Sequence, residues 1–376
     1  MGMCIGKITK NNNKYNKNHD NDDNSSINDE NNEISLSNEK DQQFLLDDLP
    51  SFNQKYTASY IVLGKGADAI VCEGIINENA KQWSGISNSI NKVAIKIISL
   101  DQPKFISKPS KFVDLNLKGN SIEESKQHGR DGFFGGVDYY RNEKKKELLL
   151  KRIKNEIELL RSMNHKGIIK LLDTFENVNK FVMVLEYAHG GSLFDRIMKI
   201  KKFPEEDALI VFYNIVKAVQ YIHNCNIVHR DLKPENILFK TPFCNDQILI
   251  CDFGYADRCD GDNLKELLGT PNYVAPEILL QHPYGKSVDI WALGVLLFII
   301  LSGNFPFNHS TQNNLFKLIV RSQFSFDVYK HKWNKVSQDA KTLIKKILVV
   351  NKEERYTIDD IINDPWMKPY RLESSM

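Results

Sequence analysis

The chain has few cysteines, and none of them forms a pair with the spacing of a metal site. The six cysteines are scattered over 376 residues without a C-x-x-C spacing, at Cys4, Cys72, Cys225, Cys244, Cys251 and Cys259. This pattern excludes the disulfide framework of a small secreted domain and a cysteine-based zinc site. We therefore expect a protein of a reducing compartment, the cytoplasm.

The sequence also lacks a long apolar run and an excess of charge of one sign. The longest apolar stretch, near Trp291–Leu301, is too short to span a bilayer and is typical of a buried helix. No apolar segment near the start could act as a secretory signal. The formal net charge of +2 gives no general attraction to nucleic acid, so no nucleic-acid partner is expected.

The first 50 residues contain little that could form a core. They hold eleven asparagines and few large apolar side chains, so residues 1–50 are predicted to be a disordered, Asn-rich extension. Gly2 could be myristoylated and Cys4 palmitoylated, although Gly6 stands where such motifs carry Ser or Thr. Two acyl chains would give peripheral membrane attachment. The alternative is an ordinary disordered N-terminus.

The next part of the chain is rich in predicted strands. Short apolar runs punctuated by glycine predict strands at Tyr60–Leu63, Ala69–Gly74 and Lys92–Ile98. Residues 100–140 lack sustained periodicity, which indicates an inserted loop. Apolar residues at helical spacing then predict a helix over Asn142–Met163.

The rest of the chain is mainly helical after two further predicted strands, at Gly167–Leu172 and Phe181–Tyr187. Helices are predicted at Glu205–His223, Ile290–Leu301 and Gln338–Val349. This order predicts an α+β architecture of two lobes. The boundaries that we expect are 56–187 for a β-rich lobe with its insert, 188–370 for a helical lobe and 371–376 for a short tail.

One octapeptide carries most of the chemical information, His229-Arg230-Asp231-Leu232-Lys233-Pro234-Glu235-Asn236. Asp231 can accept a proton from an attacking hydroxyl, Lys233 can lie beside a transferring phosphate, and Asn236 can reach a Mg²⁺ ion. Alone, such an octapeptide could be a loop between a helix and a strand. Four further motifs in a fixed order argue against that reading, and they are Gly64-Lys65-Gly66, Val93-Ala94-Ile95-Lys96, Asp252-Phe253-Gly254 and Ala275-Pro276-Glu277.

In these motifs the chain resembles the eukaryotic protein kinases, from about Tyr56 to Tyr370. The run Lys233-Pro234-Glu235-Asn236 resembles the serine/threonine type. The segments Gly190–Ile197, Asp289–Val295 and Asp364–Trp366 look most like the calcium/calmodulin-dependent group, including the calcium-dependent kinases of plants and protists. The resemblance implies the bilobal protein kinase fold, with a β-rich N-lobe that has one main helix and a mainly helical C-lobe. It also implies transfer of the γ-phosphate of Mg²⁺-bound ATP to Ser or Thr hydroxyls of protein substrates.

The resemblance also implies which residues bind ATP and Mg²⁺. The implied ATP-binding residues are Leu63, Gly64, Lys65, Gly66, Val71, Ala94, Lys96, Glu156, Glu186, Ala188, Leu238 and Asp252. Asp231, Lys233 and Asn236 are the implied catalytic residues, and Asn236 and Asp252 the implied Mg²⁺ ligands. Glu158 competes with Glu156 as the partner of Lys96, but residues two apart on a helix point to different faces. Asp68, at the tip of the glycine loop, departs from the family pattern, and an acid there would repel a triphosphate.

A second set of implied positions is structural. Leu185 is expected behind the adenine, and Leu160, Leu171, His229 and Phe253 are expected to stack into an apolar column that Asp289 anchors. Glu277 is expected to pair with Arg355.

Arg230 raises the question of control, because a buried guanidinium without an anion is costly. In many kinases a phosphorylated residue of the activation segment supplies that anion. Here this segment, residues 252–277, has no serine and one threonine, Thr270, which the family uses structurally near the catalytic residues. Glu266 stands four residues earlier, at the usual phosphosite. We expect it to pair with Arg230 as a built-in carboxylate, and the alternative is a solvated loop residue.

Three further features bear on regulation and substrate choice. The sequence contains no D-x-[DN]-x-[DN]-G calcium loop, so no built-in calcium sensor is expected. Ser192 stands where basophilic relatives often carry an acid, which predicts a weaker or shifted preference for basic substrates. A kinase-fold scaffold with little or no catalysis is the alternative function, and Asp68 and the insert keep it open.

Overall fold

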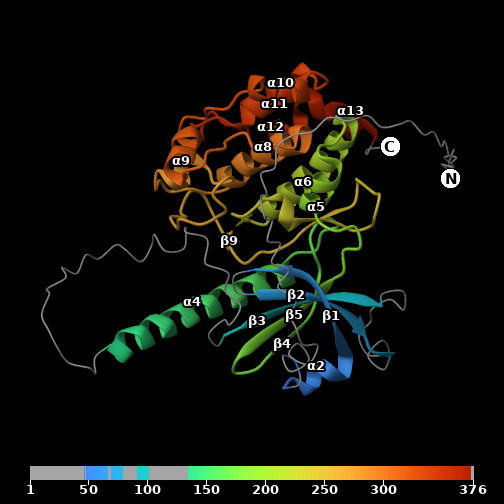
Figure 1. Ribbon diagram of the computed structural model, residues 1–376, viewed down its shortest axis with the longest axis vertical. Helices are drawn as coiled ribbons and strands as arrows, with labels where there is room; N and C mark the ends of the chain where they lie inside the picture. The colour runs from blue at the N-terminus through green and yellow to red at the C-terminus, as the bar shows by residue number, and fades with distance from the viewer. Residues whose placement is uncertain (1–45, 47, 67–68, 79–90, 101–133, 374–376) are drawn as a thin grey trace, which may run out of the picture. The chain divides into compact units, whose positions relative to one another are not determined.

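A five-stranded antiparallel sheet and one long helix form the first lobe (Figure 1). The computed structural model describes residues 46, 48–66, 69–78, 91–100 and 134–373. The strand order is β1-β2-β3-β5-β4. The elements of this N-lobe are α2 (Pro50–Lys55), β1 (Tyr56–Lys65), β2 (Ala69–Ile76), β3 (Lys92–Ser99), α4 (Phe134–Ser162), β4 (Leu171–Glu176) and β5 (Lys180–Glu186).

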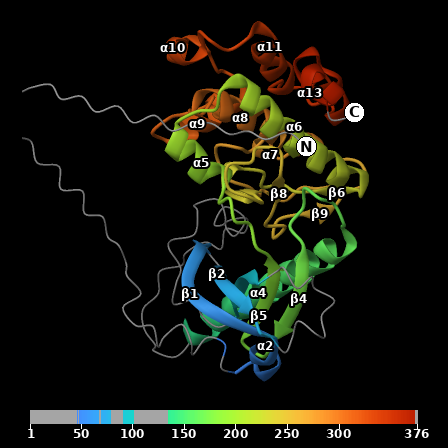
Figure 2. The ribbon, with the colours of Figure 1, turned by 90° about the vertical axis from the view of Figure 1, so that its right-hand side faces the viewer.

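Helices make up most of the C-lobe, beside two small sheets that pair β6 with β9 and β7 with β8. In Figures 1 and 2 the N-lobe sheet and the C-lobe helices gather at opposite ends of the described fold. The elements of the C-lobe are α5 (Leu193–Ile200), α6 (Glu205–Asn224), β6 (Ile227–Val228), η2 (Pro234–Asn236), β7 (Ile237–Phe239), β8 (Ile248–Ile250), β9 (Asp257–Arg258), α7 (Pro276–Leu279), α8 (Ser287–Ser302), α9 (Gln312–Val320), η3 (Asp327–Tyr329), α10 (Lys330–Trp333), α11 (Gln338–Ile347), α12 (Ile358–Asn363), η4 (Pro365–Met367) and α13 (Lys368–Glu373).

Helix α8 is the centre of the C-lobe core. Apart from Asp289 and a serine at each end, its residues are apolar on every side, and from Val288 to Ser302 all of them are buried, as expected for a helix surrounded by others. A Cβ on Gly294 would lie 2.6 Å from a side-chain atom of Ile347, so this glycine lets α11 approach closely. The helix ends at Gly303, whose φ of 70° is the left-handed conformation common after a helix. None of the described helices is both long and apolar enough to cross a membrane.

Two predicted elements of the N-lobe need correction. The strand predicted at Gly167–Leu172 is wrong, because β4 begins at Leu171 and the preceding residues form a turn with one bridge from Ile168 to Ile250. Ile168 is apolar because it packs in the core, and not because it belongs to a sheet. The predicted loop of residues 100–140 is too long, since α4 already begins at Phe134, and Gly135 and Gly136, which are poor helix formers, concealed this start in the sequence. The rest of that predicted insert, residues 101–133, lies outside the described residues.

The N-lobe begins before its predicted start at residue 56, and the predicted disordered extension of residues 1–50 reaches too far. Leu46 and Leu49 are each 4% exposed and Phe52 is fully buried, and they pack beneath the sheet with Tyr56 and Phe175. The spacing of three residues between these apolar side chains is that of a helical face. Residues 1–45, which hold the other part of the predicted extension with Gly2 and Cys4, lie outside the described residues. At the other end, α13 continues to Glu373, so the predicted tail is shorter than expected.

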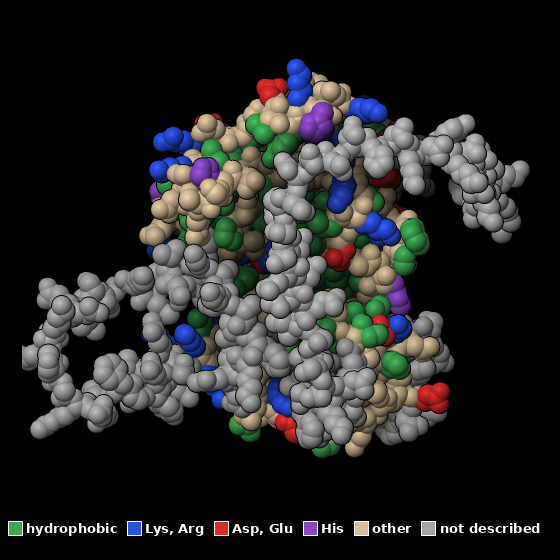
Figure 3. Space-filling model, viewed as in Figure 1, with side chains coloured by type: hydrophobic (Ala, Val, Ile, Leu, Met, Phe, Trp, Pro, Cys, Tyr) green, Lys and Arg blue, Asp and Glu red, His purple; other side chains and the backbone are tan. Residues whose placement is uncertain are grey.

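The visible surface carries charges of both signs. Figure 3 shows Lys and Arg side chains along the upper edge over α10 and α11, and acidic side chains in both lobes. This mixture agrees with the net charge of +2 and is typical of a solvated surface.

Candidate active site

The loop between β6 and η2 presents Asp231 in a strained but well-held turn. Arg230, directly before it, has a φ of 66°, a left-handed conformation that is costly for a residue other than glycine. Asp289 at the start of α8 accepts the backbone N–H groups of His229 at 2.8 Å and of Arg230 at 2.9 Å. His223 Nε2 lies 2.9 Å from the same carboxylate. The buried carboxylate therefore fixes the turn and with it the direction of the Asp231 side chain.

Three side chains converge on the Asp231 carboxylate, which is nearly buried. Lys233 Nζ donates to Oδ2 at 2.5 Å, Asn236 Nδ2 lies 3.2 Å from the same oxygen, and Thr270 Oγ1 donates to Oδ1 at 2.7 Å. Burial alone would lower the pKa of Lys233, but Asp231 raises it, so the ammonium group stays charged. One oxygen of Asp231 thus already accepts a hydrogen bond from a hydroxyl, the contact that a general base makes with an attacking alcohol.

Lys96 on β3 joins two carboxylates from different parts of the chain. Its Nζ lies 2.7 Å from Glu156 Oε1 on α4 and 3.0 Å from Asp252 Oδ1, just after β8. Glu158, the competing candidate, instead lies 3.6 Å from Arg258. Burial alone would lower the pKa of Lys96, but the carboxylates of Asp252 and Glu156 raise it. Lys96 in turn lowers the pKa of Asp252 to about 2, which keeps that carboxylate ionised.

Asp252 and Asn236 provide the oxygen chemistry that a magnesium ion needs. Asp252 has a φ of 63°, and 44% of its side chain is exposed next to the buried Lys96. Asn236 commits its Nδ2 to the backbone oxygen of Asp231 at 2.8 Å, which leaves Oδ1 as the ligand atom. Mg²⁺ prefers such hard oxygens and usually completes its shell with water and phosphate. These two residues therefore fit the implied metal.

The predicted adenine and phosphate contacts come from β1, β2, β3 and β7. The register places Val71 opposite Lys96 and Gly64 opposite Val71. A Cβ on Gly64 would meet nothing within 4 Å, and Gly66 N–H closes the turn by donating to Ala69 O at 2.8 Å. The apolar members Leu63, Val71, Ala94 and Leu238 are partly or largely exposed, as expected for side chains that a planar base would cover. Lys65 is exposed beside them, and Asp68 lies outside the described residues.

The link between the lobes, residues 186–188, limits how adenine could be recognised. Glu186 ends β5, and its backbone N–H donates to Lys170 O at 2.9 Å. The backbone carbonyl of Glu186 is therefore the group it can offer to a base. Ala188 follows two residues later and Leu185 is 9% exposed behind them.

The predicted apolar column lies inside the main core. His229 and Phe253 are fully buried, with ring centroids 4.9 Å apart in an edge-on contact. Leu160 is buried in the same core cluster, and the partly buried Leu171 packs against it.

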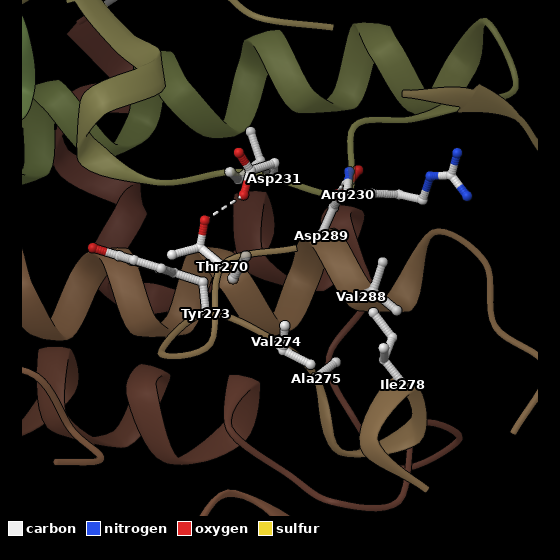
Figure 4. Close-up of a pocket in the computed structure, with 11 residues that line it drawn as sticks. Arg230, Asp231, Thr270, Tyr273, Val274, Ala275, Ile278, Val288 and Asp289 are labelled. Atoms are coloured by element: carbon white, nitrogen blue, oxygen red, sulfur yellow. Dashed lines mark hydrogen bonds between the residues drawn. The ribbon is translucent and has the colours of Figure 1, made fainter. Parts of the chain in front are cut away.

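Arg230 points away from Asp231 and toward the activation segment, as Figure 4 shows, while Thr270 faces Asp231. The guanidinium is only 5% exposed, and its Nη1 lies 2.5 Å from Glu266 Oε2. Its Nε donates to the backbone oxygen of Tyr255 at 2.5 Å, and Nη2 lies 3.3 Å from Asp257. The pair expected from the sequence is thus present, although 54% of the Glu266 side chain is exposed.

A small cavity lies between the loop that carries Asp231, which joins β6 to η2, and the end of the activation segment (Figure 4). Its volume is about 10 Å³, the space of roughly one water molecule. The lining residues include Arg230, Asp231, Thr270 and Asp289. The two segments are therefore closely packed against each other in this structure.

Three contributors to the site were missed in the sequence, namely Asp257, Tyr284 and Glu73. Asp257 shares Arg230 with Glu266, and the Tyr284 hydroxyl donates to the backbone oxygen of Glu266 at 2.6 Å. Asp257 lies only a few residues after Asp252, so an acid on the adjacent strand was a signal that could have been read. Tyr284 and Glu73 carry no local signal, because their partners are far away in the chain.

Comparison with known proteins gives a consistent result. The model of the protein kinase domain matches residues 137–367, so the match starts within α4 and the strands with Lys96 precede it. Calcium/calmodulin-dependent protein kinase type 1 of Macrobrachium nipponense is 40% identical over 215 residues, which cover 57% of this chain and 62% of that protein. Calcium-dependent protein kinase 5 of Plasmodium falciparum is 41% identical over 230 residues, 61% of this chain and 40% of that protein.

A third relative, the serine/threonine-protein kinase H1 homolog of Danio rerio, is 41% identical over 225 residues. The matched part covers 59% of this chain and 53% of that protein. The chain therefore spans less than two thirds of the length of each of these relatives.

Proposed function

The chain belongs to the protein kinase domain family, and on that premise we propose that it transfers the γ-phosphate of ATP to Ser or Thr hydroxyls of proteins. The observation that carries this proposal is the pair of side-chain clusters in the site, Asp231 with Lys233 and Asn236, and Lys96 with Glu156 and Asp252. Proteins named as serine/threonine, calcium-dependent and calcium/calmodulin-dependent kinases are similar to this chain at about 40% identity.

The residues of this chain divide the work of such a reaction. Asp231 would take the proton of the attacking hydroxyl, and Lys233 would stabilise charge on the moving phosphoryl group. Lys96, held by Glu156, would orient the phosphates. A bound Mg²⁺ ion, held by Asp252 and Asn236, would supply neutralisation of the phosphate charge. Catalysis would then rest mainly on positioning and electrostatic stabilisation.

The test is phosphate transfer to a protein substrate by protein made in bacteria, with Asp231→Asn as the comparison. We expect the substitution to lower kcat by at least about a hundredfold, because general-base catalysis contributes on that order. Lys265→Ala, on the exposed surface of the activation segment, is the control and should leave the rate near that of the wild type. Equal rates for the wild type and Asp231→Asn would favour the scaffold function.

We also propose that the activation segment needs no phosphorylation. Glu266 supplies the anion for Arg230 at 2.5 Å, and Asp257 and the Tyr255 carbonyl complete the surroundings of the guanidinium. A carboxylate has less charge and fewer oxygens than a phosphate, so its ordering effect should be weaker. Removing it should leave Asp257, at 3.3 Å, as the carboxylate beside Arg230 and loosen the segment.

The experiment compares turnover by unphosphorylated wild type, Glu266→Ala and Glu353→Ala, the last an exposed glutamate of the C-lobe. We expect Glu266→Ala to lose about tenfold or more in kcat/KM, and Glu353→Ala to lose nothing. Mass spectrometry must show that all three proteins carry no phosphate. Equal turnover of the wild type and Glu266→Ala would contradict the proposal.

Three further properties are part of the same proposal. Phosphotransfer should not require added Ca²⁺ and calmodulin, and a strong dependence would refute this. The preference for arginine upstream of the acceptor should be weak because of Ser192, which a peptide array can test.

In cells, acylation at Gly2 and Cys4 would hold a cytoplasmic protein at a membrane, and labelling with an acyl analogue should mark the wild type but not Gly2→Ala.

A further inference from the structure

Glu73 on β2 is a buried carboxylate that the catalytic residues do not use, and it is 7% exposed. In the register of β2 and β3 it lies opposite Ala94, and Val71, two residues earlier, lies opposite Lys96. Side chains alternate along a strand, and residues that pair directly share a face of the sheet. Glu73 therefore lies on the same face as three residues of the predicted nucleotide site.

Tyr187, the first residue after β5, meets Glu73 from the link between the lobes. The Tyr187 hydroxyl donates to Glu73 Oε2 at 2.9 Å, and Lys92 Nζ donates to the same oxygen at 3.0 Å. The hydrogen bond from Lys92 lowers the pKa of Glu73 against the effect of its burial, so both donors meet a charged acceptor. The ring of His189 contacts the Tyr187 ring edge-on, with centroids 4.7 Å apart.

This bond adds a side-chain tie between the link and the sheet. The neighbouring Glu186 N–H is committed to Lys170 O, and the His189 N–H to Lys240 O at 3.1 Å on the C-lobe side. Between them, the Tyr187 side chain reaches back to the nucleotide face of β2 and β3. Hydrogen bonds to charged groups are stronger than neutral ones, and the bond from Tyr187 is partly buried.

We propose that Glu73 and Tyr187 are positioning residues, which hold the link backbone at Glu186 and Ala188 at a fixed distance from the face that receives the base. The inference rests on the proposed function for the identity of the ligand, ATP. Neither side chain needs to touch the nucleotide, because each acts through the backbone beside Tyr187. The bond should therefore affect nucleotide affinity and leave the phosphoryl transfer step unchanged.

The experiment measures Mg²⁺-dependent ATP binding by titration calorimetry, together with steady-state kinetics, for Tyr187→Phe, Glu73→Gln and the double variant. Tyr329→Phe, which removes one hydroxyl from a half-buried tyrosine of the C-lobe, is the matched control. Tyr187→Phe removes the bond and should raise the Kd and KM for ATP about fivefold, whereas Glu73→Gln keeps a neutral acceptor and should raise them less. In both variants kcat should stay within about twofold of the wild type. The double variant should bind ATP no more weakly than Tyr187→Phe, because both changes act on the same contact.

The outcomes separate this inference from the proposed function. Wild type that binds no ATP would overturn the proposed function and this inference with it. Wild type that binds ATP, with Tyr187→Phe binding equally well, would overturn the inference alone. A lower melting temperature of Tyr187→Phe without a change in Kd would assign the bond a purely structural role and would also overturn it.

Discussion

The buried ion pair between Glu277 and Arg355 gives the sharpest prediction about stability. Their side chains are 5% and 1% exposed, and two hydrogen bonds of 2.7 and 2.9 Å join them. Arg355 also donates to the backbone oxygens of Ser287 and Val349, and its guanidinium lies over the Trp291 ring. The pair connects the end of the activation segment to the core around α8.

The perturbation is Glu277→Gln, which keeps the shape of the side chain and removes its charge. The amide oxygen can still accept one hydrogen bond, but its NH₂ group faces an arginine donor, and the guanidinium stays buried without a counter-charge. Removing one partner of a buried ion pair costs roughly 3–5 kcal/mol of stability. Because the amide oxygen remains as an acceptor, we expect Glu277→Gln to lower the free energy of unfolding by about 3 kcal/mol. In a lobe of this size that corresponds to a fall in Tm of roughly 6–12 °C.

Urea unfolding followed by fluorescence measures the effect, and an unchanged slope shows that the compactness of both states is preserved. Glu158→Gln is the control, because its partner Arg258 lies at 3.6 Å and both side chains are mostly exposed, so we expect less than about 0.5 kcal/mol. The double variant Glu277→Gln with Arg355→Met should recover much of the loss, since it leaves no buried unpaired charge. A cost below about 0.5 kcal/mol for Glu277→Gln would refute the reasoning.

Three other predictions follow from the same structure. Lys96→Met should lower phosphate transfer in a steady-state assay by about a hundredfold or more while the protein stays folded, because the phosphates lose a preorganised cation; a loss below about tenfold would contradict the assigned role. The pKa of Asp252 is lowered from its ordinary value of 3.8 to about 2 in the fold, so the stability that its charge contributes is present above pH 4 and is lost as the pH falls toward 2. The difference in unfolding free energy between the wild type and Lys96→Met should therefore be smaller at pH 3 than at pH 6. A difference that does not change with pH would contradict this prediction. Because Phe52 is fully buried, Phe52→Ala should lower the free energy of unfolding in urea by about 3–5 kcal/mol. For the same reason, a chain that begins at residue 56 should be less stable than one that begins at residue 45. Equal stability of the two chains would show that α2 contributes nothing.

Local patterns in the sequence were sufficient for the parts of the site that lie in short motifs. The choice of Glu156 over Glu158 followed from the resemblance, with helical geometry placing Glu158 on another face, and the structure places Glu156 beside Lys96. The pairing of Arg230 with Glu266 followed from a charge that needed a counter-charge. In both cases the resemblance named the position, and a physical requirement supported it.

The missed features depend on contacts between distant parts of the chain. Glu73 and Tyr187 are 114 residues apart, and in the sequence Tyr187 stood out only as the end of a predicted strand. Leu46 and Leu49 stand at the end of a polar segment, and its composition outweighed their spacing. The run at Gly167–Leu172 looked like a strand because burial against helices and burial in a sheet both require apolar residues.

The contact between Arg230 and Glu266 has a consequence for how long an active state would last. A phosphate ester can be hydrolysed by a phosphatase, but a side-chain carboxylate has no such bond. A segment ordered by Glu266 would keep its conformation from synthesis to degradation, with no enzymatic reset. The cell would then set the output of this protein through its abundance, its lifetime and the supply of its substrates.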